Sequence, residues 1–520
     1  MSAGEFWKIA TDTPVDQLFT YRLPEEFADQ ASIGQFVTVP LGRGGRKVSG
    51  ILLEKEKVEP EFEAKNICEI QTEYPLLPKH YIDWCQWLAK YYLHPLGEVL
   101  HLSLPPLSKK NSKKTKKSDP SMGDKEKNHR PKPELSLEQN RVLDSIQKTQ
   151  GFQTHLLFGV TGSGKTEVYM HLLEKVLEEE QSAIVIVPEI SLTPQLIDRF
   201  VDRFGKQIAV LHSQLTPREK TNQWWDMIEG RKKIVIGARS ALFCPLPKIG
   251  MIIVDEEHES SFKQDEKLKY HGRDAAVMLG KFHNCPVVLG SATPSLESWH
   301  NCLQKKYQLH IMENRVMDRQ LPQVEIVDLR NTPKESHDLR PNWCSPVLFE
   351  KIHETLERGD QVALFLNRRG VAPFVLCPAC GHTRECPNCD ISLTLHGKSH
   401  LVCHYCDYHE NLKSRCPDCH EDEMKPVGLG TEAIENDMRR LFPDRLIVRA
   451  DRDEIQDRVS LENFIRQMES GAVDILIGTQ MIAKGLDFPK LTLVGLVLAD
   501  IGFHLPDFRS TERSFQILTQ

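Results

Sequence analysis

Short apolar runs alternate with amphipathic stretches along most of the chain after Leu135. The runs are bounded by turn-forming residues and lie at 155–160, 184–188, 233–238, 251–257 and 286–293. Continuous apolar runs of this length are typical of strands that are buried on both faces of a parallel sheet. A second series begins at 362–367 and resumes at 444–450, 473–479 and 491–500. The pattern predicts an α/β fold with two sheet units, which we assign to residues 135–330 and 331–520.

Residues 1–105 show a different pattern. Alternating apolar positions at 35–40 and 48–53 predict a small β-rich domain. A helix is expected over 81–92, where one helical face carries Trp84, Trp87, Leu88 and Tyr91. Such an aromatic face either packs into a core or stacks on nucleic-acid bases, and the helical spacing favours the core.

Residues 106–134 are predicted to form a flexible linker. Six lysines lie within 109–117, and almost no apolar residue follows Leu107. Such a segment cannot bury enough apolar surface to offset the entropy lost on ordering. It acts either as a solvated tether or as a tether that also contacts phosphates.

Composition narrows the class of protein. Hydrophobic residues make up 40% of the chain and charged residues 27%, which is ordinary for soluble globular proteins. The longest uncharged apolar run, 491–499, has nine residues, too few for a membrane-spanning helix, and the N-terminus lacks the apolar stretch of a signal peptide. The net charge of −7 leaves any nucleic-acid binding to local basic patches. We therefore expect a cytoplasmic protein with no membrane partner.

One segment fits the phosphate-binding pattern G-x-x-x-x-G-K-[ST]. It consists of Gly159, Val160, Thr161, Gly162, Ser163, Gly164, Lys165 and Thr166. In such a loop the glycines let backbone N–H groups approach phosphates, the lysine reaches the β- and γ-phosphates, and the threonine hydroxyl binds Mg²⁺. The strand before the loop and the helix after it favour a nucleotide site over a purely structural glycine loop.

Three acids, Asp255, Glu256 and Glu257, follow the apolar run that ends at Val254, and the first two are catalytic candidates. Asp255 is expected to hold Mg²⁺, because it ends a buried strand near a phosphate-binding loop. Glu256 is expected to orient or deprotonate the attacking water, and together with Lys165 these two acids form the predicted catalytic set. Gln139 precedes the loop by 20 residues and is a candidate for reading adenine, although a glutamine on an amphipathic helix is usually solvent-facing.

Eight of the 14 cysteines form four C-x-x-C pairs within 43 residues. The pairs are Cys377/Cys380, Cys386/Cys389, Cys403/Cys406 and Cys416/Cys419. Eight thiolates match two tetrahedral Cys₄ zinc sites, whereas a redox motif needs a single pair. Alternating apolar residues at 391–395 and a turn at 396–399 predict a hairpin, which would group the two inner pairs and leave the outer pairs to share the second ion. We therefore predict a structural two-zinc module at 377–419, inserted in the second sheet unit.

The ordered motifs resemble those of superfamily 2 helicases. They are the phosphate-binding loop, DEEH at 255–258, SAT at 291–293, GTQ at 478–480 and AKGLD at 483–487. With VPEISLTPQ at 187–195, IGARSALF at 236–243 and the cysteine insert, nearly the whole chain is similar to the PriA family of bacterial replication-restart helicases. The resemblance implies two RecA-like lobes that bind ATP and Mg²⁺, preceded by a domain at 1–105 that binds a DNA 3′ end. It also implies ATP-dependent 3′→5′ unwinding at stalled or repaired forks, which restarts replication by primosome assembly.

The resemblance implies DNA contacts and partners as well. Phe19 and Tyr21 would line the pocket for the 3′ end. Phe262, Lys263 and Tyr270 would belong to an aromatic-rich loop that relays DNA contact to the ATP site, and aromatic residues interleaved with basic ones suit base stacking plus phosphate contact. The implied partners are forked and single-stranded DNA, the single-stranded-DNA-binding protein, other primosome proteins and the replicative helicase, in a nucleoid-associated protein.

Three features depart from the family pattern. Thr20 stands where the family carries an aspartate, and the lysine-rich linker occupies the place of a winged-helix domain. The chain ends at Gln520, before the family's Gly-Arg-x-Gly-Arg motif, so we expect a fragment or a truncated gene. The alternative function is therefore a non-catalytic, zinc-stapled scaffold that binds forks. An RNA helicase of the same superfamily is a third possibility, against which the cysteine insert and the N-terminal domain argue.

Overall fold

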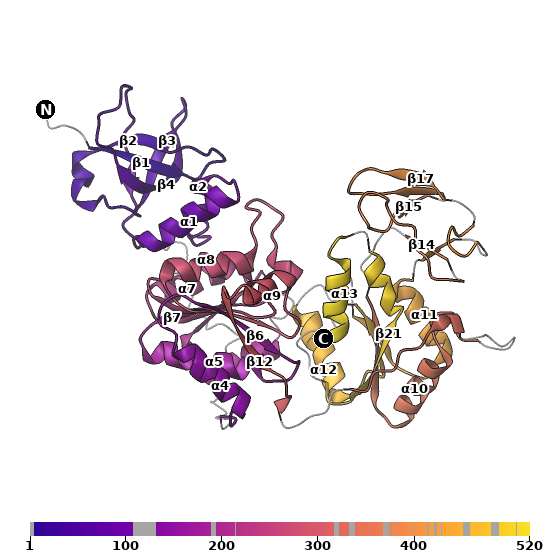
Figure 1. The fold of residues 1–520 in the computed structure, drawn as a ribbon. Helices are drawn as coiled ribbons and strands as arrows, with labels where there is room; N and C mark the ends of the chain where they lie inside the picture. Colours follow the sequence, from indigo (N-terminus) through magenta and orange to yellow (C-terminus); the bar gives the residue numbers. More distant parts are fainter. Residues whose placement is uncertain are drawn as a thin grey trace. The chain divides into compact units, whose positions relative to one another are not determined.

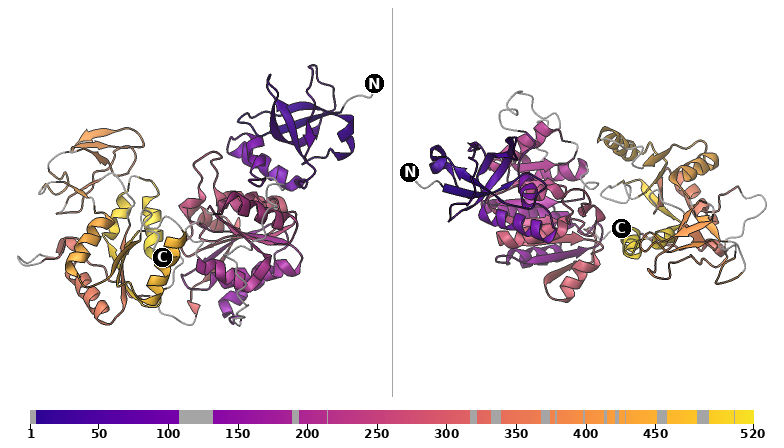
Figure 2. Two further views of the ribbon diagram at one scale, coloured as in Figure 1. Left: turned by 180° about the vertical axis from the view of Figure 1, so that it is seen from behind. Right: turned by 90° about the horizontal axis from the view of Figure 1, so that it is seen from above.

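The structure is a computed structural model of the chain. It describes residues 5–107, 132–188, 194–213, 215–316, 322–331, 339–367, 374–377, 379–397, 399–412, 415–420, 424–427, 429–450, 458–479, 488–505 and 507–520. The chain divides into two compact units, Met1–Arg319 and Gln320–Gln520 (Figures 1 and 2). Most of the predicted linker, 108–131, lies outside the described residues.

The first unit begins with a five-stranded antiparallel sheet of order β2-β1-β4-β3-β5. Its elements are β1 (Glu5–Thr11), β2 (Phe19–Leu23), the 3₁₀ helix η1 (Glu25–Gln30), β3 (Phe36–Leu41), β4 (Arg46–Lys55) and β5 (Glu69–Ile70). Ile9, Val37 and Leu52 are fully buried in one apolar cluster, because alternate side chains of each strand point to the same face. The start of the chain is therefore β-rich, as its alternating pattern predicts.

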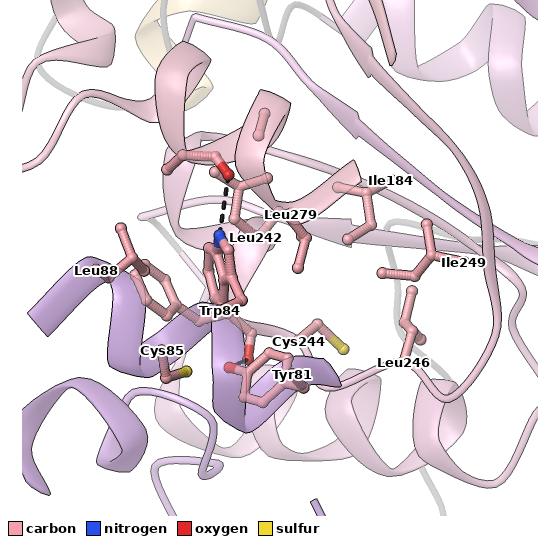
Figure 3. Close-up of a cluster of buried hydrophobic side chains, with 14 of the residues drawn as sticks. Tyr81, Trp84, Cys85, Leu88, Ile184, Leu242, Cys244, Leu246, Ile249 and Leu279 are labelled. Carbon is pink, nitrogen blue, oxygen red and sulfur yellow. Dashed lines mark hydrogen bonds between the residues drawn. The ribbon is translucent and has the colours of Figure 1, made fainter. Parts of the chain in front are cut away.

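Two helices follow this sheet, α1 (Lys79–Tyr91) and α2 (Leu96–His101). Trp84 and Leu88 of α1 are fully buried in a cluster that they share with the next domain. The indole Nε1 of Trp84 donates a hydrogen bond to the backbone oxygen of Ala275 at 3.0 Å (Figure 3). Trp84 and Leu88 are therefore core, as the spacing favours, whereas Trp87 of the same predicted face is half-buried and Tyr91 is 65% exposed.

The next domain, which we call lobe 1, contains a seven-stranded sheet of order β12-β6-β11-β10-β7-β9-β8. Every pairing in it is parallel. The strands are β6 (Thr154–Gly159), β7 (Ser182–Ile186), β8 (Ile208–Leu211), β9 (Ile234–Gly237), β10 (Ile249–Val254), β11 (Val287–Ser291) and β12 (Tyr307–Met312). All five apolar runs predicted as strands between 155 and 293 form strands of this sheet.

Helices cover both faces of the lobe 1 sheet (Figure 1). They are α4 (Leu137–Gln147), α5 (Lys165–Glu178), α6 (Pro194–Phe204), α7 (Pro217–Ile228), α8 (Gly272–His283) and α9 (Leu296–Leu303), with 3₁₀ helices η4 (Gly205–Gln207), η5 (Arg239–Phe243) and η6 (Ser260–Phe262). Neighbouring strand residues point to opposite faces, so Leu156 packs in the cluster of α7 and α8, and Leu157 in that of α4 and α5. Burial on both faces explains the continuous apolar runs.

The second unit contains a four-stranded parallel sheet of order β19-β20-β13-β21. Its elements are η8 (Leu329–Asn331), α10 (Pro346–Glu357), β13 (Gln361–Leu366), α11 (Thr431–Leu441), β19 (Ile447–Ala450), α12 (Arg458–Ser470), β20 (Ile475–Gly478), β21 (Leu491–Val497), η9 (Ala499–His504) and α13 (Ser510–Thr519). Leu364 packs in the cluster of α10 and α11, and its neighbour Ala363 in that of α12. The two parallel α/β sheets confirm the predicted class of two RecA-like lobes.

The cysteine module lies between β13 and α11 along the chain. It contains one two-stranded and one three-stranded antiparallel sheet, made of β14 (Phe374–Leu376), β15 (Thr394–His396), β16 (His400–Val402), β17 (His409–Asn411) and β18 (Lys425–Val427). The predicted hairpin is present, because β15 pairs antiparallel with β16. Among the helices that the structure describes, none combines the length and apolar composition needed to cross a membrane.

Candidate nucleotide site and cysteine module

The phosphate-binding loop connects the end of β6 to the start of α5. Gly162 and Gly164 have φ angles of +83° and +82°, a backbone conformation that side chains other than glycine rarely adopt. A Cβ at Gly159 would lie 2.6 Å from the Oγ of Ser163, so a larger residue there would displace the Ser163 hydroxyl. The three glycines therefore give the loop the tight path that the motif predicts.

The loop fits a phosphate group. The Nζ of Lys165 donates to the backbone oxygen of Gly159 at 2.7 Å, which holds the ammonium group over the loop. The hydroxyl of Ser163 is buried and makes no hydrogen bond to any described residue. The loop also ends at the N-terminus of α5, where unpaired backbone N–H groups attract anions. Thr166 is the second residue of that helix and directly follows Lys165.

Gln139 lies against this loop rather than in solvent. Its side chain is buried, and its Nε2 donates to the backbone oxygen of Ser163 at 3.1 Å. Its Oε1 accepts a hydrogen bond from the backbone N–H of Ser136 at 2.8 Å, which completes the N-terminal capping box of α4. Gln139 thus connects α4 to the loop, and an adenine contact remains a prediction.

Asp255 follows β10 at the same edge of the sheet. Its Oδ1 accepts a hydrogen bond from the hydroxyl of Tyr169 on α5 at 2.9 Å. Burial raises the pKa of the Asp255 carboxyl above its ordinary value, and the charge of Lys165 opposes that shift. A partly buried carboxylate beside the loop is suited to a divalent cation, because the ion supplies the positive charge that water provides only in part.

Glu256 and His258, the second and fourth residues of DEEH, differ in their environment. Glu256 has a φ angle of +49°, an unusual conformation for a glutamate and one that is common where a functional side chain must be aimed. The Nδ1 of His258 lies 2.8 Å from the hydroxyl of Ser291, which also accepts from the backbone N–H of Thr293 at 2.9 Å. The DEEH and SAT motifs are therefore joined by a hydrogen bond, which the sequence spacing does not show.

Glu257 forms a buried network that the sequence does not indicate. Its side chain is fully buried, and its carboxylate accepts from the backbone N–H of Ser295 at 2.7 Å, the Ser295 hydroxyl at 2.9 Å and the Ser298 hydroxyl at 2.8 Å. It also pairs with the guanidinium of Arg273 at 3.1 Å. Burial alone would lower the pKa of Arg273, but the carboxylates of Asp274 and Glu257 raise it above its ordinary value.

The aromatic-rich segment after DEEH differs from its prediction. Phe262 and Tyr270 are each 1% exposed and pack in the lobe 1 core, so neither ring presents a face to a base. The ring of Tyr270 meets that of Phe243 edge-on at 5.4 Å. Lys263 is exposed, as a phosphate contact requires, whereas Arg273 is buried in its ion pair. The aromatic residues of this segment are therefore core residues, and its lysines are the ones that face solvent.

In the N-terminal domain, Phe19 and Tyr21 both lie on β2. Tyr21 is buried, and its hydroxyl donates to the backbone oxygen of Pro40 at 3.2 Å, so the ring is part of the domain core. Phe19 is half-buried against the same core. Thr20 lies between them and opposite Lys8 of β1. The predicted contact of Tyr21 with a DNA end is not supported by this buried position, while Phe19 retains an exposed part.

The eight predicted ligands gather into two groups of four sulfur atoms. One group contains Cys377, Cys380, Cys416 and Cys419, and the other contains Cys386, Cys389, Cys403 and Cys406. This is the grouping that the hairpin predicts. Sulfur–sulfur distances of 3.6 Å occur in both groups, close to the ~3.8 Å edge of a tetrahedron with Zn–S bonds of about 2.3 Å. Both groups fit a closed, structural zinc site.

Part of the sequence motif set lies outside the described residues. Gly478 and Thr479 end β20 and follow it, but residues 480–487 and 189–193 belong to the undescribed part of the chain. The predicted roles of these segments remain predictions.

Three family profiles match parts of the chain. Residues 8–105 match a 3′DNA-binding domain, residues 137–301 a DEAD/DEAH box helicase, and residues 386–410 the PriA DNA helicase Cys-rich region domain. The second match covers the phosphate-binding loop, the DEEH motif and the parallel sheet that carries them. Lobe 1 therefore matches the DEAD/DEAH box helicases, and the scaffold without catalysis is not favoured.

Relatives match over most of the chain. The replication restart protein PriA of Rickettsia conorii is 37% identical over 514 residues, which cover 98% of this chain and 76% of that relative. Its counterpart in Bacillus subtilis is 45% identical over 390 residues, which cover 74% of this chain and 48% of that relative. The chain belongs to the PriA family of replication restart proteins. The region matched in B. subtilis is about half of that relative's length.

Solved structures of helicases overlap the fold more loosely. RecG bound to a three-way DNA junction is 16% identical with a TM-score of 0.41, over 95% of this chain and 64% of that one. The DUF1998 helicase MrfA bound to DNA is 14% identical with a TM-score of 0.42, over 72% and 44%. TM-scores this low do not support a family assignment, which therefore rests on the sequence relatives.

Proposed function

We propose that the chain hydrolyses ATP and uses the energy to move 3′→5′ along DNA at stalled or repaired forks, where it restarts replication by primosome assembly. The observation that carries this proposal is the joint position of Lys165 and Asp255 at one edge of the lobe 1 sheet, where Lys165 is held to Gly159 and its charge acts on the Asp255 carboxyl. The chain's membership of the PriA family and its match to a 3′DNA-binding domain support the DNA part.

In the proposed reaction, the loop backbone, Ser163 and Lys165 bind the phosphates of ATP. Asp255 and Thr166 would hold Mg²⁺, which supplies positive charge to the phosphate oxygens. Water attacks the γ-phosphorus, Glu256 accepts a proton from that water, and ADP leaves with the β-phosphate oxygen. The hydrogen bond between His258 and Ser291 joins the hydrolytic motif to the SAT segment, and so offers a route from phosphate release to DNA movement.

On the DNA side, we assign the 3′ end to the domain at 1–105 and phosphate contacts to the exposed lysines after DEEH, of which Lys263 is one. Forked and single-stranded DNA are the proposed substrates. The single-stranded-DNA-binding protein, other primosome proteins and the replicative helicase are the proposed partners, and the nucleoid region of the cytoplasm is the proposed location. The cysteine module would hold two zinc ions in a structural role.

The test is Mg²⁺-dependent ATP hydrolysis by residues 1–520 with and without a forked DNA. We expect fork-stimulated turnover that is abolished in Lys165→Ala and reduced about 10²–10⁴-fold in Glu256→Gln, because a missing general base costs that much. Lys175→Ala is the matched control, since it removes an exposed lysine of the same helix, away from the loop. Unwinding of duplexes with a 3′ or a 5′ single-stranded tail then decides the polarity.

Two results contradict the proposal. Turnover that survives Lys165→Ala would place catalysis elsewhere. Fork binding without turnover above the Lys165→Ala level would leave this chain as a DNA-binding segment of a helicase. Equal unwinding from both tails would contradict the 3′→5′ assignment alone.

A further inference from the structure

One face of the three-stranded sheet in the cysteine module is rich in histidine. His396 of β15 and His400 of β16 are opposite each other across the hairpin, and His409 lies on the adjacent strand β17. Side chains alternate along a strand, and Leu395 and Leu401 point into the module core. The three imidazoles therefore share the outer face, where all three are exposed.

A fourth histidine reaches this face from the loop after β16. The Nε2 of His404 lies 3.1 Å from the Nε2 of His396, and the rings meet at an interplanar angle of 67°, so they are not stacked. Two imidazole nitrogens on one ion, each about 2.0–2.1 Å from the metal, are separated by roughly 3.0 Å at a right angle and roughly 3.4 Å at a tetrahedral angle. The observed distance lies between these two values.

Both histidines are held by rigid parts of the module. His404 lies between Cys403 and Cys406, two members of one four-sulfur group, and His396 ends a strand that pairs with β16. Once zinc binds the cysteines, the backbone positions of both imidazoles are fixed. Little conformational entropy is then lost when a further ion binds, which favours binding.

We propose that His396 and His404 form a third metal site, open to solvent, that takes a divalent transition ion such as Zn²⁺. Imidazole nitrogen is a preferred ligand for zinc, copper and nickel. Within the described residues only the two cysteine groups bring three or more ligand atoms together, so water completes the coordination shell of this ion. The site therefore differs from the closed cysteine sites by binding more weakly and keeping exchangeable positions.

A hydrogen bond between two neutral imidazoles is the alternative explanation of the short distance. Such a bond between exposed groups competes with water and contributes only about 0.5–1.5 kcal/mol. An ion engages a lone pair on each ring at once. The two explanations predict different metal contents, so a titration separates them.

The experiment uses the full chain loaded with two zinc ions, with the content verified by mass spectrometry, and titrates it with Zn²⁺ in a calorimeter. We expect one further ion per chain. His396→Ala and His404→Ala should each weaken this binding by more than about tenfold, since even the loss of an outer-shell partner costs 10–100-fold. Both variants should retain the two tightly held ions, which shows that the module remains folded.

His420→Asn is the matched control. It removes another exposed histidine beside a zinc-ligand cysteine, and asparagine tolerates the left-handed backbone found there, with φ of 60°. The control should bind the third ion like the unaltered chain. A chain that binds two ions only, or a third ion that persists in both alanine variants, overturns the proposal.

Discussion

Lobe 1 and the cysteine module both bury strongly polar groups, and they stabilise them in different ways. In lobe 1 the fully buried Glu257 carboxylate is paired with Arg273 and hydrogen-bonded to Ser295 and Ser298. These residues lie in a domain with a seven-stranded sheet and helices on both faces. In the module, four of the ten buried residues of the core cluster are cysteines. The described residues of the module form strands and turns but no helix. Lobe 1 can therefore tolerate damage to its polar network, whereas the module has almost no core without metal.

The largest expected effect follows from removing one metal ligand. In Cys403→Ser we expect the zinc content to fall from two ions to one and residues 386–410 to lose protection from hydrogen exchange, while lobe 1 stays protected. Structural zinc contributes about 10–16 kcal/mol to the folding of small domains, more than this core can replace. Zinc analysis and hydrogen-exchange mass spectrometry give the two measurements.

Cys68→Ser is the control, because Cys68 is an exposed cysteine of the N-terminal domain. It should change neither readout. A Cys403→Ser variant with a protected module would show that its few apolar side chains suffice for folding, and would remove the contrast with lobe 1.

The second effect is smaller and concerns the buried ion pair. Glu257→Ala removes the buried partner of the Arg273 guanidinium and leaves it only the partly exposed Asp274, so we expect a loss of up to about 3–5 kcal/mol in the free energy of unfolding. Arg273→Ala should cost a similar amount for the reverse reason. The double variant should cost clearly less than the sum, because no uncompensated charge then remains. Six of the seven tryptophans lie in the first unit, so fluorescence during urea unfolding reports on it.

Glu179→Ala supplies the matched control for this cycle. Its partner Lys175 lies 3.6 Å away on the same helix, and both side chains are about half exposed, so the loss should stay below about 0.5 kcal/mol. Additive losses for Glu257→Ala and Arg273→Ala would show that the two side chains do not act as a pair.

What the sequence reveals about these regions depends on how local the pattern is. The phosphate-binding loop and the C-x-x-C pairs are set by neighbours a few residues apart, so spacing alone predicts their positions, and the hairpin at 391–401 even predicts how the cysteines group. Glu257 and Arg273 meet only through the packing of α8 against β10, and a buried arginine has the same sequence signature as an exposed one. Burial of Phe262 and Tyr270 also depends on this packing and leaves no mark in the sequence. The sequence therefore predicts them as DNA contacts, although they fill the core. Their alternation with lysine is also the alternation between buried and exposed positions.

A third way of burying polar groups occurs where α1 packs on lobe 1. His80 of α1 and His283 of α8 meet edge-on at 4.1 Å between ring centroids, and the Nε2 atoms of both are buried without a hydrogen bond to any described residue. Burial lowers the pKa of both imidazoles, and together with the charge of His80 it lowers that of His283 to about 3. Burial outweighs the opposing charge of Asp83 at His80, so the folded state favours the neutral form of both rings.

The smallest predicted effect is on the pH dependence of the stability of the first unit, because the folded state keeps His283 neutral. Between an unfolded pKa near 6.5 and a folded pKa of about 3, the unfolded chain binds a proton that folded His283 does not, so the first unit loses stability as the pH falls through that range. His283→Phe keeps a ring in the site but cannot bind the proton. The proton uptake by the unfolded chain between about pH 7.5 and about pH 5 corresponds to roughly 2 kcal/mol. In a unit of this size we expect the midpoint of thermal unfolding of the variant, relative to that of the unaltered chain, to rise by about 2–4 °C over this pH range. His155, His310 and His271 are present in both proteins, so the difference between the two profiles reports on the pair His80 and His283. Parallel pH profiles for the two proteins would mean that His283 takes up its proton in the folded state, and that this junction does not keep its imidazoles neutral.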